Sequence, residues 1–365
     1  MNQVPERTAL KVCFAPDWSR SVPYQSQLAQ ALYAHGAHVD YLRHYRRALP
    51  LWRGLRDLDL DLFHLHWPEK FWQIGERFKV LRRLRYPLDL YLVSRRYPLL
   101  LTAHNLLPHA TDRRFMQKRN SRISYRLARR VFVHSKRAGE LVVETFGVCP
   151  EKIVEIPFGD LSPPLGPPQA KGLARVELGL DPAEPAALIF GAVRPYKGID
   201  QVIAWWRRQP GLPRLHVVGW GSADHSSDTY ATSLESMARE QANISVKIIP
   251  WLPESELNKW LSAADVVICN HTRAFSSGGA CLARSFGLPL LMPASAEAVD
   301  LGEPDSRVRR FDAVDNDFGK ALEEMLAIGP DHAAAAGWRE ATSWERVAAI
   351  TATAYREVAD ETRRR

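Results

Sequence analysis

Short apolar runs alternate with longer stretches of helical periodicity along the whole chain. In the first half, the apolar runs that we predict as strands are residues 11–17, 38–43, 62–67, 99–105, 130–135 and 153–159. In the second half they are residues 186–193, 214–221, 245–252, 265–270 and 289–294. Because strands that alternate with helices build βαβ units, the pattern predicts an α/β protein with parallel sheets.

A Pro- and Gly-rich segment, LSPPLGPPQAKG at residues 161–172, separates the two halves and is typical of an interdomain linker. We therefore predict two doubly wound, Rossmann-like domains, residues 1–160 and 173–340, that face a central cleft. The last stretch, residues 341–365, has one apolar face, and we expect a helix that packs back on the first domain.

Composition narrows the class of protein without identifying it. The chain of 365 residues has 46% hydrophobic and 25% charged residues, as ordinary globular domains do. Its four cysteines share no metal-ligand spacing, which indicates a reducing compartment. The first ten residues lack the apolar core of a signal peptide, and no apolar run reaches the length of a membrane span. We expect a cytoplasmic protein that touches a membrane surface.

The positive charge is concentrated in the first half. Residues 1–160 carry about +12 and residues 161–365 about −4, which together give the net charge of +8. Anionic lipid, nucleic acid, an anionic substrate or a plain solvated face would each explain such an excess. Aromatic and leucine residues mixed into the basic runs favour an anionic membrane, and the absence of any reader motif argues against nucleic acid.

The stretch FGAVRPYKGID, residues 190–200, follows an apolar strand and carries two cations. If the strand ends near Gly191, then Arg194 and Lys197 lie just past its carboxyl end. A guanidinium beside an ammonium suits a diphosphate, although two ordinary surface cations would give the same pattern.

A second small-residue stretch follows another strand. Ser276, Ser277, Gly278 and Gly279 precede the helical run ACLARSFG. Free N–H groups and the dipole at a helix N-terminus form an anion site, although a plain serine N-cap is the common alternative. Gly219 belongs to a third strand end, VVGWG, where a lone G-x-G without a further glycine argues against an NAD enzyme.

Histidines end two strands of the first half. HLHWPE contains His66 and Glu69, and TAHNLLPH contains His104, Asn105 and His109. Such histidines are usually core residues, but a pair of strand ends could instead orient sugar hydroxyls or supply an acid and a base. Their spacing matches no usual metal-ligand set. The Asp-x-Asp pattern in DLDLDL runs straight into a strand, and we interpret it as a polar lead-in.

The chain resembles the GT-B glycosyltransferases of the bacterial group-1, GT4-like set. The resemblance rests on Gly191 with Lys197-Gly198, on Gly219, on ELNKWLSAADVVI before the Ser-Gly loop, and on SWERVAAITATAY. VPYQSQLAQAL, HLHWPE, TAHNLLPH, RPYKG and SSGGACLARSFGLP are similar to a subgroup that assembles exopolysaccharides, including xanthan-type β-mannosyltransferases. The family implies metal-independent hexosyl transfer from a UDP- or GDP-sugar, often to a polyprenyl-diphosphate-linked glycan at the inner membrane face.

The resemblance carries over residue by residue with two departures. Lys197 falls on the family's diphosphate-binding lysine, whereas its arginine is Ala192 here and Arg194 stands three residues after Gly191. The retaining enzymes have two glutamates separated by seven residues, and aligning Gly287 places Ala274 and Leu282 there. An inverting reaction with a base from the first domain becomes an alternative to retention.

These inferences give a set of expected site residues, without a metal or cofactor. The catalytic candidates are His104, which matches a histidine of the family, Glu69, His109 and Asp17. The expected donor diphosphate site is Arg194, Lys197, Gly191, Ser276, Ser277, Gly278 and Gly279, with the nucleotide base near Trp251, Leu252 and Gly219. Acceptor-side candidates are Tyr24, Gln25, His66 and Asn105. A nucleotide-sugar epimerase, a phosphorylase or a non-catalytic binding protein are the alternatives.

Overall fold

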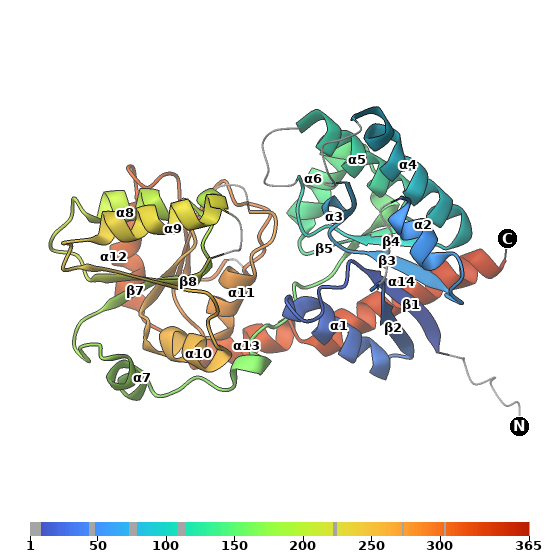
Figure 1. Cartoon of the computed structure of the whole chain (residues 1–365). Helices are drawn as coiled ribbons and strands as arrows, with labels where there is room; N and C mark the ends of the chain where they lie inside the picture. Colours follow the sequence, from blue (N-terminus) through green and yellow to red (C-terminus); the bar gives the residue numbers. More distant parts are fainter. Residues whose placement is uncertain are drawn as a thin grey trace, which may run out of the picture. The chain divides into compact units, whose positions relative to one another are not determined.

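The computed structural model describes residues 9–43, 48–72, 79–107, 114–221, 225–271, 274–302 and 304–364. The chain divides into two compact units (Figure 1). Unit 1 comprises residues 1–159 with 342–365, and unit 2 comprises residues 160–341. Each unit has its own parallel sheet and is described by itself below.

Unit 1 has a six-stranded parallel sheet in the order β2-β1-β3-β4-β5-β6. Its strands are β1 (Leu10–Ala15), β2 (Ala37–Tyr41), β3 (Leu62–Leu65), β4 (Leu99–Thr102), β5 (Arg130–Val133) and β6 (Ile153–Glu155). After β2 the chain crosses to the other side of β1, so the winding direction reverses between β1 and β3. Ligands of such sheets bind outside the carboxyl ends of the strands at this reversal.

Helices on both sides of the sheet bury its apolar strands. They are α1 (Pro23–Ala34), α2 (Pro50–Leu55), α3 (Glu69–Trp72), α4 (Lys79–Arg96), α5 (Arg114–Leu127), α6 (Lys136–Phe146) and α14 (Trp344–Arg363). The C-terminal helix α14 packs on α1 and buries Val347 and Val358 in the same core as β1. Its Tyr355 hydroxyl lies 2.6 Å from Nδ1 of the buried His64, so the chain end is part of unit 1.

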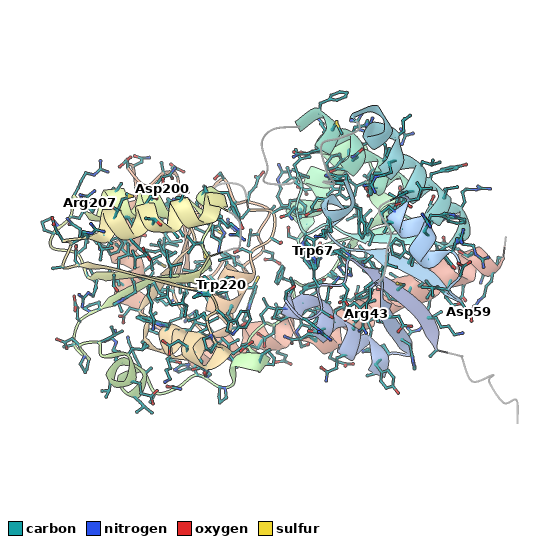
Figure 2. All side chains as sticks on the ribbon, in the orientation of Figure 1. Arg43, Asp59, Trp67, Asp200, Arg207 and Trp220 are labelled. Atoms are coloured by element: carbon teal, nitrogen blue, oxygen red, sulfur yellow. The ribbon has the colours of Figure 1, made fainter. Side chains whose placement is uncertain are left out.

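Unit 2 repeats this architecture with the order β12-β11-β10-β7-β8-β9. Its strands are β7 (Ala186–Ala192), β8 (Arg214–Trp220), β9 (Ile244–Ile249), β10 (Val266–Ile268), β11 (Leu290–Pro293) and β12 (Val308–Phe311). The winding reverses between β7 and β10, which pair directly. Trp67 and Trp220, labelled in Figure 2, mark the carboxyl ends of β3 and β8. The α/β fold expected from the sequence is confirmed, whereas β12 was not expected.

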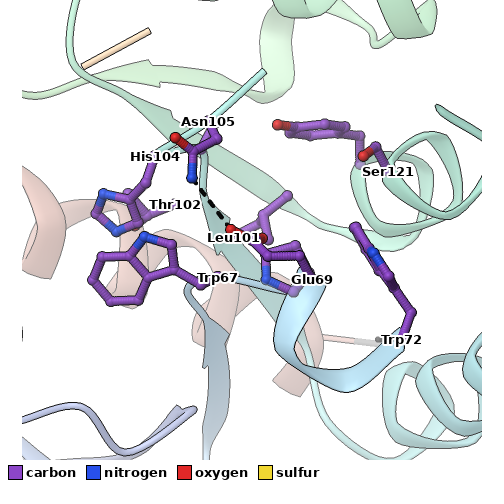
Figure 3. A pocket seen from close by; sticks show the side chains of 11 residues that line it. Trp67, Glu69, Trp72, Leu101, Thr102, His104, Asn105 and Ser121 are labelled. Atoms are coloured by element: carbon purple, nitrogen blue, oxygen red, sulfur yellow. Dashed lines mark hydrogen bonds between the residues drawn. The ribbon is translucent and has the colours of Figure 1, made fainter. Parts of the chain in front are cut away.

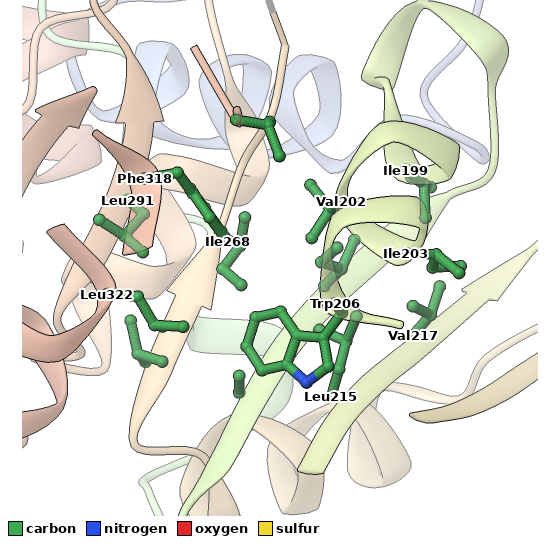
Figure 4. Packing of buried hydrophobic residues seen from close by; sticks show 14 of the residues in the cluster. Ile199, Val202, Ile203, Trp206, Leu215, Val217, Ile268, Leu291, Phe318 and Leu322 are labelled. Carbon is green, nitrogen blue, oxygen red and sulfur yellow. The ribbon is translucent and has the colours of Figure 1, made fainter. Parts of the chain in front are cut away.

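A tryptophan-centred core fixes the helices of unit 2 on its sheet. These helices are α7 (Lys171–Leu178), α8 (Ile199–Trp206), α9 (His225–Ala238), α10 (Glu254–Ala263), α11 (Gly278–Ser285), α12 (Phe318–Ile328) and α13 (His332–Ala341). Trp206 is fully buried among side chains of α8, α12 and the strands (Figure 4). Its indole N–H donates to the carbonyl oxygen of Pro213 at 3.0 Å, which satisfies the ring's polar atom.

Part of the segment 161–172, which the sequence predicts as a linker, is anchored on unit 2. Nδ2 of Asn258 on α10 donates to the carbonyl oxygens of Leu165 and Pro167, both at 2.9 Å. The backbone N–H of Gln169 donates to Oγ of Ser262 at 3.0 Å. Proline has no N–H, so this segment cannot form the regular backbone hydrogen bonds of a helix or strand. The side-chain contacts from α10 hold it in place instead.

Candidate functional site

The two glycine-containing stretches of unit 2 meet at the reversal of its sheet. FGAVRPYKG spans the carboxyl end of β7 and the turn after it, and the Ser-Gly loop follows the neighbouring strand β10. Phe190 of β7 also packs on the first turn of α11, since its ring lies 3.7 Å from the position that a Cβ on Gly279 would occupy. The structure therefore brings the two expected anion-binding elements together.

A side-chain hydrogen bond joins the two loops directly. Nδ2 of the buried Asn270, after β10, donates to the carbonyl oxygen of Gly198, after β7, at 2.9 Å. Gly198 has a φ of 57° and a Cβ there would lie 2.6 Å from the same Nδ2, so both its backbone angle and its lack of a side chain are required. The rings of Tyr196 and His271 also contact each other, at 6.0 Å between centroids.

Lys197 is a largely buried cation beside Gly191. Gly191 has a φ of 101°, and a Cβ at this residue would lie 3.3 Å from the Lys197 ammonium. Burial lowers the pKa of Lys197 to about 8, opposed by Cys269 and assisted by the charge of Arg194. Burial also raises the pKa of Cys269 to about 12, so its thiol is neutral at pH 7 and is no counter-ion. Within the described ranges, Lys197 forms no ion pair with a carboxylate.

Arg194 adds a second positive charge to the same turn. It is the residue before the short 3-10 helix η3 (Pro195–Lys197), and its guanidinium donates a long hydrogen bond, 3.4 Å, to the carbonyl oxygen of Val193. Its effect on the pKa of Lys197 places the two cations within electrostatic reach. Two cations without a carboxylate beside Lys197 form a site of positive potential, which suits an anionic ligand.

The N-terminus of α11 contributes backbone donors to this site. Ser277 is the N-cap, and its Oγ accepts a hydrogen bond from the N–H of Ala280 at 3.2 Å, so this hydroxyl has a structural role. The N–H groups of Gly278 and Gly279 open the helix and have no acceptor in the part of the chain that the structure describes. Ser276 precedes them and is partly exposed.

The residues expected around the nucleotide base differ in accessibility. Trp251, two residues after β9, is 60% exposed, whereas Leu252 is 4% exposed and packs in the core. The burial of Leu252 argues against its expected contact with the nucleotide base. The sequence alone does not indicate which of the two residues faces solvent. Gly219 is in β8, where a Cβ would lie 2.3 Å from the carbonyl oxygen of Gly191, so its role is close packing under the β7 turn.

In unit 1, β3 and β4 bring His66 and His104 together as the sequence suggested. Nδ1 of His66 lies 3.1 Å from Nε2 of His104, and both rings are buried. Burial, and secondarily the neighbouring imidazoles, hold the pKa of each well below its usual value, so both are neutral at pH 7. Among the residues that the structure describes, the buried Nε2 of His66 has no hydrogen-bond partner.

That unpaired nitrogen favours one tautomer of the pair. If His104 donated to His66, the proton of His66 would sit on Nε2 as a buried N–H without an acceptor, which is the costlier arrangement. His66 therefore donates from Nδ1, and His104 accepts at Nε2 and carries its own proton on Nδ1. In this tautomer His104 is a hydrogen-bond donor, and neither of its nitrogens is free to act as a base.

A small pocket lies beside these histidines at the carboxyl ends of β3 and β4 (Figure 3). Trp67 stacks on His104, with 4.1 Å between ring centroids and 11° between planes. Glu69 at the start of α3 accepts a hydrogen bond from Nδ2 of Asn105 at 3.2 Å. Burial raises the pKa of Glu69, while its own N–H and Asn105 oppose that increase. A carboxyl with a raised pKa in a pocket is suited to acid–base chemistry.

Other expected residues of unit 1 have supporting positions. Tyr24 and Gln25 of α1 are 2% and 0% exposed, so the structure contradicts direct contact with an acceptor. Gln25 instead holds the turn after β1. Its amide nitrogen Nε2 donates to the carbonyl oxygen of Pro16 at 2.9 Å, and its Oε1 accepts from the N–H of Trp18 at 2.8 Å. His66, which is 0% exposed, likewise lies behind the surface and contacts His104. Amphipathic periodicity alone did not reveal which polar residue of α1 faces inward.

Asp17 and His109 complete the catalytic candidates. Burial raises the pKa of Asp17, but hydrogen bonds from Ser19 and the Arg43 guanidinium, 3.2 Å away, outweigh it and hold this pKa below its usual value. Asp17 is thus an ionised partner of Arg43 and a weak base. His109 lies outside the described residues.

Two tryptophans at the strand ends were missed by the sequence reasoning. Trp18 follows β1, Trp67 follows β3, and their rings lie 4.7 Å apart between centroids. Both are partly exposed, so they present apolar faces next to the pocket. A tryptophan directly after a strand, in APDW and HLHW, was the available signal.

In the described parts of both units, no three or more His, Cys, Asp or Glu side chains are grouped so that they could hold a metal ion. The same ranges contain no helix with the length and apolar character of a membrane span.

Comparison with known sequences relates the chain to sugar transferases. Residues 11–159 match the family model described as Glycosyltransferase Family 4. A D-inositol 3-phosphate glycosyltransferase of Segniliparus rotundus is 31% identical over 238 residues, which are 60% of this chain and 50% of that protein. A GDP-mannose:glycolipid 4-beta-D-mannosyltransferase of Xanthomonas campestris pv. campestris is 27% identical over 248 residues, or 67% and 64%. The chain thus covers half to about two thirds of the lengths of these relatives.

Solved structures share the whole architecture at low sequence identity. Sucrose-phosphate synthase from Thermosynechococcus elongatus is 18% identical, with a TM-score of 0.70 over 97% of this chain and 100% of the other. HepE from Anabaena, solved with UDP-glucose, is 13% identical, with a TM-score of 0.65 over 98% and 100%. These likenesses establish the fold, two Rossmann-like units of the GT-B type.

Proposed function

Since the chain is a GT4-like protein with the GT-B fold, we propose that it is a hexosyltransferase that uses a nucleoside-diphosphate sugar. Unit 2 would hold the donor, a GDP- or UDP-sugar, and unit 1 would bind the acceptor and supply the base. The acceptor would be a lipid-linked glycan, such as a polyprenyl-diphosphate oligosaccharide. The setting would be exopolysaccharide synthesis at the inner face of the cytoplasmic membrane.

The observation that carries this proposal is the uncompensated ammonium of Lys197. A largely buried cation costs folding free energy when it lacks a carboxylate partner, as Lys197 does among the described residues, and an anionic ligand would offset that cost. Arg194 and the free N–H groups of Gly278 and Gly279 surround the same reversal of the sheet. Together they match the charge and hydrogen-bonding needs of a diphosphate, so no metal ion would be required.

The same groups would promote departure of the diphosphate. As the bond between the anomeric carbon and the diphosphate oxygen breaks, negative charge grows on that oxygen. The fixed charges of Lys197 and Arg194 would stabilise the transition state more than the ground state, which is the requirement for catalysis. Deprotonation of Lys197 above its pKa of about 8 would remove part of this stabilisation.

In unit 1, we assign the base to Glu69. The acceptor hydroxyl oxygen would attack the anomeric carbon, and its proton would pass to the Glu69 carboxylate as the diphosphate leaves. The raised pKa of Glu69 makes the carboxylate a stronger base than an ordinary glutamate. His104, as the Nδ1–H tautomer, would donate a hydrogen bond instead of accepting a proton.

An inverting displacement fits the residues of unit 2 better than retention does. Ala274 and Leu282, which stand at the positions of the family's two glutamates, are 9% and 5% exposed within an apolar core. Neither position offers a carboxylate to the sugar. The Xanthomonas relative is described as a β-mannosyltransferase acting on a glycolipid from GDP-mannose, which makes GDP-mannose and a glycolipid the first substrates to test.

Release of the free nucleotide tests this proposal. The purified full chain is incubated with GDP-mannose, UDP-glucose and other common donors, with and without a lipid-linked oligosaccharide. A transferase releases nucleotide only with its acceptor present and extends the glycan by one sugar. An epimerase converts the donor without acceptor, and a binding protein changes neither, so either result contradicts the proposal.

A further inference from the structure

Two adjacent helices of unit 1, α4 and α5, carry most of its excess positive charge. α4 contains six Lys or Arg residues and one carboxylate, and α5 contains five and none. The one carboxylate, Asp89, is buried and accepts hydrogen bonds from the backbone N–H groups of Leu51 and Trp52 at 3.0 and 2.7 Å. The outer surface of the two helices therefore presents no carboxylate of their own.

The inner faces of the two helices are fixed against each other and against the sheet. The helices lie side by side (Figure 1), and the hydroxyl groups of Tyr86 and Ser124 join them at 2.6 Å. Leu90 and Val93 of α4 are fully buried. Since these contacts define the inward side, the residues on the opposite side face away from unit 1.

That outward side is apolar where a surface helix is normally polar. Leu84, Leu88 and Tyr91 of α4 are 65%, 49% and 51% exposed, and their spacing places them on one stripe that ends at the exposed Arg95. On α5, Phe115 is 83% exposed and begins a stripe that continues with cations. Those exposed cations are Lys118, Arg122 and Arg126.

We propose that this outward face of α4 and α5 is a docking surface for a bilayer that contains anionic phospholipid. Leu84, Leu88, Tyr91 and Phe115 would enter the boundary between headgroups and acyl chains. The cations of both helices would lie at the level of the lipid phosphates. The inference rests on the proposed function for its purpose, because a lipid-linked acceptor is presented at such a surface.

Charge and apolar character together select lipid over other partners. A nucleic acid would pair with the cations but would leave a stripe of Leu and Tyr without a contact, since phosphate and sugar dominate that kind of interface. Single exposed apolar residues are normal on protein surfaces, whereas a stripe of three with a neighbouring phenylalanine marks an interaction site. A bilayer with anionic headgroups satisfies both features at once.

Vesicle flotation of the full chain tests the proposal. Vesicles of phosphatidylcholine alone are compared with vesicles that also contain phosphatidylglycerol, at low and high salt. We expect binding to the anionic vesicles that weakens as salt screens the cations, and little binding to phosphatidylcholine alone. Absence of binding to anionic vesicles, or equal binding to both kinds, would overturn the proposal.

Matched variants locate the surface. We expect Leu84→Ser with Leu88→Ser to weaken vesicle binding roughly tenfold or more. The control is Leu173→Ser with Val176→Ser on α7, because these side chains are 54% and 66% exposed. Retained binding by the α4 variant, or equal losses of binding in both variants, would contradict the assignment. Thermal melting establishes that every variant is folded.

Two charge-reversal variants and a nucleotide-binding measurement separate the docking surface from the donor site. Lys118→Glu with Arg122→Glu should abolish binding to anionic vesicles, whereas Arg207→Glu with Lys320→Glu, exposed cations of unit 2, should preserve it. The Lys197→Met variant should float with vesicles as the wild type does. If the wild-type chain floats with anionic vesicles but binds no nucleotide, the proposed function alone is contradicted. If it binds nucleotide but does not float, the docking surface alone is contradicted.

Discussion

Nδ2 of Asn270 donates a hydrogen bond to the carbonyl oxygen of Gly198 at 2.9 Å, and this bond joins the loop after β10 to the loop after β7. Gly198 directly follows Lys197, so the contact fixes the end of the turn that carries both cations. One buried amide thereby connects the two segments that we assign to the donor diphosphate.

Replacing Asn270 by Ala should weaken nucleotide binding through this turn. Loss of a buried hydrogen bond costs about 1–3 kcal/mol, so we expect roughly a 5- to 150-fold increase in the Kd for the nucleoside diphosphate if the cost falls on the turn. Isothermal titration calorimetry measures it. Asn258→Ala is the matched control, because Asn258 is equally buried and also holds backbone carbonyls, but at residues 165–167. Equal losses of affinity in both variants would show that Asn270 has no specific role.

Lys197 should make the free protein less stable at neutral pH. Its pKa is about 8 in the folded chain, against an ordinary value of 10.5, so the unfolded chain binds the proton more tightly between these values. The free energy of unfolding therefore rises with pH between about 8 and about 10.5. Below about pH 8 the destabilisation by Lys197 is complete and does not change with pH. We expect Lys197→Met to be more stable at pH 7, by on the order of 1–3 kcal/mol. Urea unfolding at pH 7 and pH 10 measures both effects.

The difference between wild type and Lys197→Met should shrink toward pH 10. A Met variant that is less stable at pH 7, or a difference that does not change with pH, would contradict the picture of an uncompensated cation. Lys259→Met serves as the control, since Lys259 lies on the surface of α10 and pairs with Glu177 at 2.7 Å.

Glu69→Gln should lower kcat by roughly a hundred- to ten-thousand-fold and leave donor binding unchanged. In the wild type, the base acts only when ionised, so kcat should fall as pH drops through the raised pKa of Glu69. Asn105→Ala removes a hydrogen bond that lowers this pKa, so the acidic limb of the pH–rate profile should move to higher pH. An Asn105→Ala profile identical to the wild type would argue against Glu69 as the base.

Trp67→Ala should raise the KM for the acceptor and leave the KM for the donor unchanged. The indole face beside the pocket suits the apolar face of a sugar ring, and its loss should cost about a 2- to 10-fold increase in KM. Steady-state kinetics with the acceptor varied provides the measurement. Trp52→Ala, at another partly exposed tryptophan of unit 1, is the control. An effect on donor KM alone would move Trp67 out of the acceptor site.

The sequence predicted the fold because apolar strands and helical stretches alternate so regularly. Strand β12 escaped prediction, since two of its four residues, Arg309 and Arg310, are charged and hide the apolar pattern. Its strand character depends on pairing with β11 at the edge of the sheet. Such pairing is a tertiary property that no local pattern contains.

The candidate site was only partly predictable for a related reason. Lys197 and Glu69 could be predicted because each follows a strand, and the parallel strands of a sheet bring the residues that follow them to one edge of that sheet. Lys197 lies at this edge in unit 2, and Glu69 in unit 1. The burial of Gln25 and Leu252, and the stacking of Trp67 on His104, depend on contacts between segments far apart in the chain. The tautomer of His104 depends in addition on a nitrogen of His66 that finds no hydrogen-bond partner in the described ranges.

Calorimetric titration of GDP and UDP into wild type, Lys197→Met and Lys259→Met tests the central claim most directly. We predict that one nucleotide binds the wild type and the Lys259→Met control with equal affinity. Lys197→Met should lose at least roughly tenfold in affinity, the value of one charge-assisted contact to phosphate. Equal nucleotide affinity in all three proteins, or no binding to the wild type, would contradict the assignment of unit 2 as the donor site.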